Sequence, residues 1–166
     1  MTKFLLSAHV LAVILAIGPV TVAASMFPAV TRRVLAAPAG ALAAPEAPEA
    51  PEAPDVTVLR TLHRICRVYA AVGLAVPVFG VATGASLGIL GDAWLIVSAV
   101  LTAVAAVLLA IVILPRQDDI LAAASKAEPL HERLPARLAM TTGVFNLLWA
   151  TVTVLMIVRP GSTTGA

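Results

Sequence analysis

A histidine and a cysteine lie three residues apart in the stretch His63-Arg64-Ile65-Cys66, which is the spacing of two metal ligands on one helix. Zinc sites need three or four ligands, and His131, in the other long connection expected on the same side of the membrane, could supply only a third. We therefore predict no metal site. Three neighbouring arginines are expected instead to meet anionic lipid head groups: Arg60, Arg64 and Arg67.

His9 falls inside a long apolar run, and an ionisable residue in such a run is by default a candidate functional group. At 1.5 Å per residue it lies about 7.5 Å below the outer membrane face. The same depth holds one hydroxyl from each of the other helices: Thr83, Ser98 and Thr153. We predict a polar layer in which His9 binds these hydroxyls, serving as a structural feature or a minor ligand site. Alternatively, His9 anchors the helix at the membrane interface, close to Lys3.

Two prolines interrupt the apolar runs, and each removes a backbone donor from the carbonyl four residues earlier. Pro19 frees the Leu15 carbonyl, and Pro77 frees that of Gly73. A free carbonyl in hydrocarbon needs a partner. The other strongly polar residue within these runs is Asn146, and depth counting predicts that its amide binds the Leu15 carbonyl or one nearby.

Gly80, Gly84 and Gly88 repeat at four-residue spacing, which lets two membrane helices approach closely. Each glycine inside a helix costs about 1 kcal/mol relative to alanine, so a triplet predicts a contact that offsets this cost. The spacing leaves open whether the contact is within the chain or with a second copy.

The elements that must position these residues are four apolar runs bounded by charges, each long enough for a membrane helix of about 20 residues. The chain is 60% hydrophobic and 12% charged, too apolar for a soluble core of this length. We predict an all-α, polytopic four-helix transmembrane bundle forming a single membrane domain, residues 1–166. The helices are expected over about 4–27, 68–90, 93–114 and 138–158, and Pro28 is expected to end the first.

Basic residues set the predicted orientation, because lysine and arginine favour the cytoplasmic side. Nine lie in the two long connections and two near the ends of the chain, so both termini are predicted outside. The alternative is a cleaved signal peptide ending near Ser25. A net charge of +2 gives no reason to expect a nucleic-acid partner.

The two long connections differ in character. Residues 38–55 are rich in proline, glutamate and alanine, with Glu-Ala-Pro repeats that favour an extended cytoplasmic linker. Residues 118–128 look helical, begin with two aspartates that suit a helix N-terminus, and are expected to lie at the membrane surface.

Several blocks of the sequence resemble small, uncharacterised integral membrane proteins of bacteria, and of actinobacteria in particular. They are residues 3–11, Gly18-Pro19-Val20-Thr21, and residues 63–69 and 143–149. A histidine early in the first helix is also similar to the copper-resistance D proteins and to the membrane protoporphyrinogen oxidases, which implies haem as a cofactor at His9. The sequence departs from the oxidases, since its third run has no lysine and its apolar runs have no second histidine.

We therefore predict a non-enzymatic accessory, assembly or oligomerising component of a bacterial inner membrane, without a cofactor. Its expected partners are the lipid bilayer and a second copy or another membrane subunit. Two alternatives stay open: a haem- or metal-binding redox protein that uses His9, and a small transporter built on the helices that contain Pro19 and Pro77.

Overall fold

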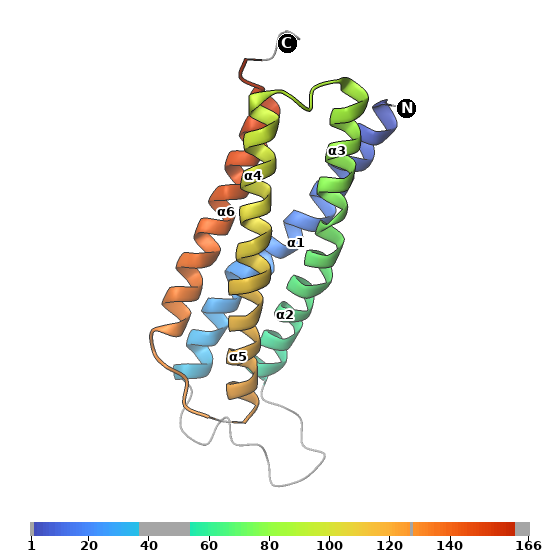
Figure 1. Cartoon of the computed structure of the whole chain (residues 1–166). Helices are drawn as coiled ribbons and strands as arrows, with labels where there is room; N and C mark the ends of the chain where they lie inside the picture. Colours follow the sequence, from blue (N-terminus) through green and yellow to red (C-terminus); the bar gives the residue numbers. More distant parts are fainter. Residues whose placement is uncertain (1, 37–53, 127, 162–166) are drawn as a thin grey trace.

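The computed structural model describes residues 2–36, 54–126 and 128–161, and the elements within them are helices (Figure 1). They are α1 (Thr2–Ala36), α2 (Pro54–Gly73), α3 (Ala75–Leu87), α4 (Ala93–Val107), the π-helix η1 (Leu108–Ile113), α5 (Leu114–Ser125) and α6 (Leu134–Val158). They combine into four helices that are long and apolar enough to cross a membrane, as predicted: Thr2–Ala36, Pro54–Leu87, Ala93–Ser125 and Leu134–Val158. Most of the predicted linker, residues 38–53, lies outside the described part of the chain.

α1 runs for 35 residues and contains both Pro19 and Pro28, so the prediction that Pro28 ends the first helix is wrong. Pro28 is fully buried, and the residues on either side of it, Phe27 and Val30, belong to the main core. A proline inside a helix costs about 3 kcal/mol, whereas burying one large apolar side chain contributes about 1.5–3 kcal/mol. Two valines beyond Pro28 are buried, Val30 and Val34. Packing beyond the proline therefore outweighs the lost bond.

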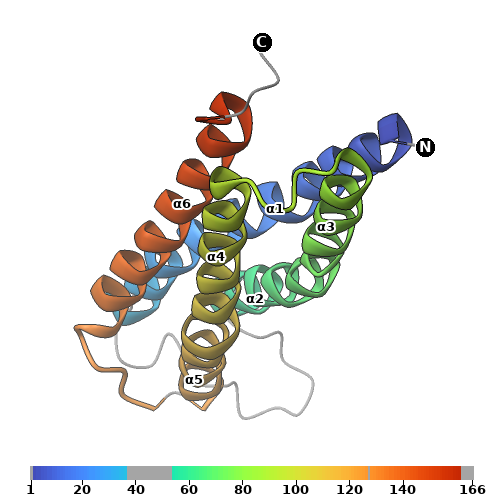
Figure 2. The same ribbon diagram turned by 45° about the horizontal axis from the view of Figure 1, so that its top comes forward.

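The second long helix changes direction where α2 ends at Gly73 and α3 begins at Ala75 (Figure 2). Pro77 follows in the first turn of α3. At its other end α3 stops at Gly88, whose φ of 70° is left-handed. The Ile89 N–H donates to the Gly84 carbonyl over 3.1 Å, and the Gly88 N–H reaches the Ala85 carbonyl over 3.2 Å. This is a Schellman motif, which closes the helix before the turn into α4.

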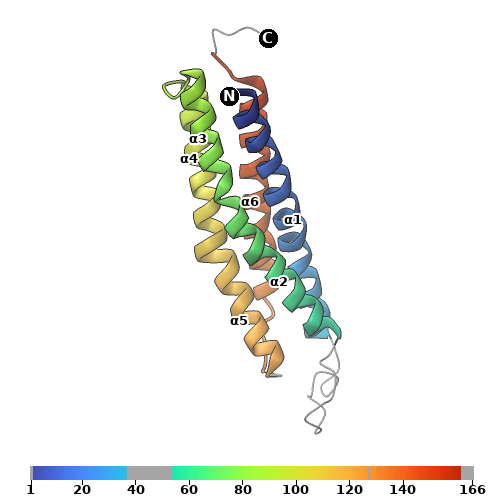
Figure 3. The same ribbon diagram turned by 90° about the vertical axis from the view of Figure 1, so that its right-hand side faces the viewer.

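α4, η1 and α5 form one continuous rod (Figure 3). The helix expected over residues 118–128 is present as far as Ser125, but it belongs to the end of the third long helix and is not a separate element in the connection. Residues of this extension pack into the core against α2, including Ile120 and Ala124. Burial of these apolar side chains draws the segment along the bundle axis.

α1 crosses behind the other helices (Figure 1): the first part of α1 lies beside α3, and the last part of α1 lies beside α6. The largest buried cluster lies in the half of the bundle where α1 ends and α2 begins, and it extends into η1, α5 and α6. A second, small cluster of Ala12, Ala16 and Val76 joins the first half of α1 to α3. The bundle is thus most densely packed towards the end that carries the two long connections.

At the opposite end, where α1 begins and α6 ends, polar contacts join α4 to its neighbours. The Trp94 indole donates to Asp92 over 3.0 Å. The Arg159 guanidinium, just after α6, lies 5.7 Å from the centre of the Trp94 ring, a cation–π contact. This contact ties the start of α4 to the end of α6.

Candidate functional site

A buried polar cluster joins α2 to α5 in the dense half of the bundle. The His63 Nδ1–H lies 3.1 Å from Gln117 Oε1, and the Gln117 amide donates to Cys66 Sγ over 3.7 Å. Gln117 and Cys66 are fully buried and His63 is 6% exposed. These two hydrogen bonds link the His63–Cys66 pair of α2 to α5.

The outer edge of the same histidine faces a carboxylate. His63 Nε2 lies 2.9 Å from Asp118 Oδ1, but the direction is poor for a hydrogen bond, so the contact is an ion pair when the ring is protonated. His131 lies apart, where its Nδ1 accepts from the Arg133 N–H over 3.2 Å. Among the described residues, no three histidine, cysteine or acidic side chains could hold a metal ion together.

The π-helix decides which residue of the third rod enters this cluster. Counting about 3.6 residues per turn from the buried Trp94, Ser98 and Ala105, an unbroken α-helix would turn Arg116 towards the core. The π-helix adds about one residue to the repeat, and Gln117 is buried instead. Arg116 reaches sideways, with Nη1 3.4 Å from Thr141 Oγ1 on α6. Sequence reasoning missed Gln117 because it placed this segment in a connection outside the bundle.

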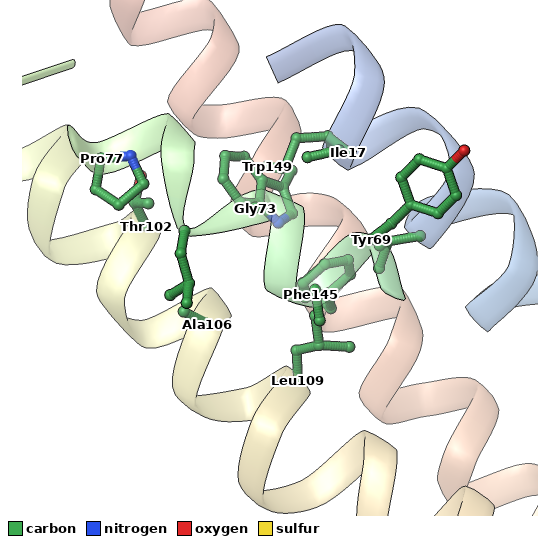
Figure 4. Close-up of a pocket in the computed structure, with 13 residues that line it drawn as sticks. Ile17, Tyr69, Gly73, Pro77, Thr102, Ala106, Leu109, Phe145 and Trp149 are labelled. Atoms are coloured by element: carbon green, nitrogen blue, oxygen red, sulfur yellow. The ribbon is translucent and has the colours of Figure 1, made fainter. Parts of the chain in front are cut away.

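A second candidate is an apolar cavity of about 80 Å³ beside the break between α2 and α3 (Figure 4). It is lined from four long helices, with Trp149 and Phe145 of α6 opposite Gly73 and Pro77. The Trp149 indole nitrogen is buried and has no hydrogen-bond partner among the described residues. Pro77 cannot donate to the Gly73 carbonyl. The cavity thus combines one unused donor with a carbonyl that lacks its usual helix partner.

His9 lies against α3 and not in a pocket of hydroxyls. Its Nδ1 lies 3.0 Å from the Val76 carbonyl, and since a carbonyl only accepts, Nδ1 carries the proton. A Cβ added to Gly80 would be 3.1 Å from His9 Cε1. The lack of a side chain at Gly80 therefore lets the His9 ring pack directly against α3.

The three hydroxyls predicted to surround His9 bond instead to their own helices, each four residues back. Thr83 donates to Phe79, Ser98 to Trp94 and Thr153 to Trp149, over 2.7–2.9 Å. The predicted hydrogen bonds to His9 are therefore not the ones that form. A threonine or serine hydroxyl reaches the carbonyl of its preceding turn without help from another helix, and that local bond competes with any partner across the bundle.

Asn146 binds α1, but at a different place from the one predicted. Its Nδ2 donates to the Ser25 hydroxyl over 2.9 Å, and its Oδ1 is buried without a hydrogen-bond partner among the described residues. Leu15 is 58% exposed. The depth count assumed upright helices, whereas α1 crosses the bundle (Figure 1), and Asn146 meets it at Ser25, ten residues after Leu15.

The three glycines of α3 serve different purposes. Gly80 leaves room for the His9 ring. A Cβ on Gly84 would lie 2.9 Å from Leu90 Cδ2 and 3.1 Å from Leu95 Cδ2. Both contacts lie within the chain. Gly88 has open space around it and ends the helix through its positive φ, so it makes no helix contact of the predicted kind.

No family model, curated protein or solved structure matches this chain. The histidine–glutamine cluster can hold two helices together, and the cavity can take a small apolar group.

Proposed function

We propose that the chain is a multi-pass protein of a bacterial inner membrane that acts as a non-enzymatic accessory or assembly component. Its four long helices would cross the bilayer with both termini outside and the two long connections in the cytoplasm. The basic residues support this orientation, since nine of eleven lie in or beside those connections. The start of α1 and the end of α6 also lie at one end of the bundle, as an even number of crossings requires (Figure 1).

The observation that carries the proposal is that two of the long helices continue past their apolar stretches, on the same side of the bundle, as charged helical segments. The charged beginning of α2, from Pro54 to Arg67, adds roughly 20 Å to its apolar part, and α5 from Arg116 to Ser125 adds roughly 15 Å. A hydrocarbon core is about 30 Å thick. These segments would stand in the cytoplasm as a helical platform, made of α2 residues 54–67, α5 residues 116–125 and the end of α1.

The buried core of the bundle continues into the platform. Val34 from α1, Val56 and Leu59 from α2 and Ile120 from α5 are buried members of the main cluster, which also runs through the apolar stretches. A part of the protein that keeps its shape outside the lipid offers a partner a preformed surface, which lowers the entropic cost of binding. This favours an assembly role over that of a membrane protein without a protein partner.

Photo-crosslinking in intact cells tests the proposal. A photo-reactive residue is placed at Ala122 on the platform, and a matched one at Leu147, which is exposed on the membrane-spanning part of α6. The platform position is expected to give a discrete protein adduct that Leu147 does not. If neither position gives an adduct, the assembly role is contradicted.

An absorbance spectrum of the purified protein separates this proposal from the haem alternative. His9 is engaged with Val76 and Gly80, which favours a packing role, and we expect no Soret band. A Soret band that disappears in His9→Ala would replace the proposal with a redox function.

A further inference from the structure

Beyond an assembly role, we propose that a basic concavity on α2 binds the phosphate of an anionic phospholipid. The concavity has a volume of about 460 Å³ and is lined by Arg60, His63, Arg64, Arg67 and Val68. These positions recur at three- and four-residue spacing, so they share one face of the helix. Three guanidinium groups therefore converge on one hollow, each with a fork of donors that matches phosphate oxygens.

The charges in the concavity are arranged for an anion. Arg64 and Arg67 are exposed, and neither has an ion-pair partner among the residues that the structure describes. Like charges three and four residues apart on a helix repel one another. A bound phosphate reduces this repulsion and supplies the counter-charge that Arg64 and Arg67 lack within the described part of the chain, so occupation of the site is favourable.

His63 forms the inner wall of the concavity, and Asp118 controls whether the His63 ring can contact an anion bound there. The histidine is held from behind by Gln117, and its Nε2 lies 2.9 Å from the Asp118 carboxylate. The Asp118 side chain is 59% exposed, so it can move away from the ring. A phosphate in the concavity is repelled by this carboxylate and competes with it for His63 Nε2 when the ring is protonated. Asp118 therefore weakens anion binding.

The surroundings indicate a lipid and not a soluble phosphate. Val68 lines the concavity, and Val72 follows it on the same face of α2. These two apolar side chains are 50% and 41% exposed, respectively, and come directly after the arginines. A basic hollow directly above an exposed apolar strip matches a molecule with an anionic head and a hydrocarbon tail. The apolar strip gives a free phosphate ion nothing to contact.

Lipid titration of the full-length protein in a neutral detergent tests the site. Binding of phosphatidylglycerol is measured by native mass spectrometry, with phosphatidylcholine as the uncharged comparison. In the double variant Arg64→Gln/Arg67→Gln, phosphatidylglycerol binding is expected to weaken by about 30-fold, from the loss of two charges near an anionic head group. Asp118→Asn is expected to strengthen it.

A matched control removes two charges from the same end of the bundle, through Arg32→Gln/Arg33→Gln at exposed positions of α1. This control should retain most of the binding. Equal losses in both double variants would show diffuse attraction and overturn the site. So would weaker binding in Asp118→Asn.

Two further arms keep the result clear. Arg64→Lys/Arg67→Lys preserves charge and should bind better than the glutamine variant, and helix content from circular dichroism shows that each variant is folded. Inorganic phosphate is added as a competitor and is expected to displace the lipid only weakly. Displacement by phosphate as effective as that by phosphatidylglycerol would assign the site to a soluble anion and overturn the lipid assignment.

Discussion

Asn146 on α6 donates a hydrogen bond of 2.9 Å to the hydroxyl of Ser25 on α1, and Ser25 in turn donates to the Thr21 carbonyl over 2.7 Å. A side-chain amide thus reaches the backbone of a helix 121 residues away through a single hydroxyl. Ser25 lies 11 residues before the end of α1 and Asn146 lies 12 residues after the start of α6. The pair therefore sets the register of the two helices from the end at which they meet.

A double-mutant cycle should detect this contact. Ser25→Ala and Asn146→Leu are each expected to lower the free energy of unfolding, with a coupling energy of about 0.6 kcal/mol, the average for polar contacts between membrane helices. Unfolding in mixed detergent micelles measures it. Leu147→Ala at the neighbouring exposed position serves as the control, and a coupling energy of zero would mean that the bond contributes nothing.

Loss of Gln117 alone should lower the stability more than loss of Gln117 and His63 together. Gln117→Leu leaves His63 Nδ1 buried without its acceptor and is expected to cost about 1–3 kcal/mol. Adding His63→Leu removes the stranded donor, so the double variant should recover much of the stability. Thermal unfolding of the parent protein and the two variants checks this. A double variant less stable than Gln117→Leu alone would contradict the argument.

Gly84→Leu should destabilise the turn between α3 and α4, because the new side chain would collide with Leu90 and Leu95. Overpacking of this kind typically costs about 1–3 kcal/mol. The same change at Gly18 of α1, where nothing lies within 4 Å of the added Cβ, should stabilise the helix slightly through its propensity. Melting temperatures in detergent compare the two, and equal values would show that Gly84 has room.

Gly88→Ala tests backbone conformation without a steric clash. Its φ of 70° disfavours any residue with a Cβ, so a loss of about 1 kcal/mol is expected although the space around it is open. Gly91 lies in the same turn, has equally open surroundings and no positive φ, so Gly91→Ala should be nearly neutral. Chemical denaturation distinguishes them, and similar losses at both sites would argue against the conformational explanation.

The number of long helices could be predicted from the spacing of charges alone. Runs of about 20 apolar residues must satisfy their backbone groups internally, and the helix is the local structure that does so. The same local reasoning failed where packing competed with it. Pro28 does not end α1, since buried side chains on both sides of it outweigh the lost hydrogen bond.

The partners of the polar side chains were decided only by the tertiary structure. The types and spacing of His9, Asn146 and the His63–Cys66 pair identified them as groups in need of partners, but depth along upright helices misplaced the partners of His9 and Asn146. The crossing of α1 brings His9 to Val76 and Ser25 to Asn146, and the π-helix turns Gln117 towards His63. Crossing angles and helix register arise from the fit of many side chains at once, and no single run of sequence contains that information.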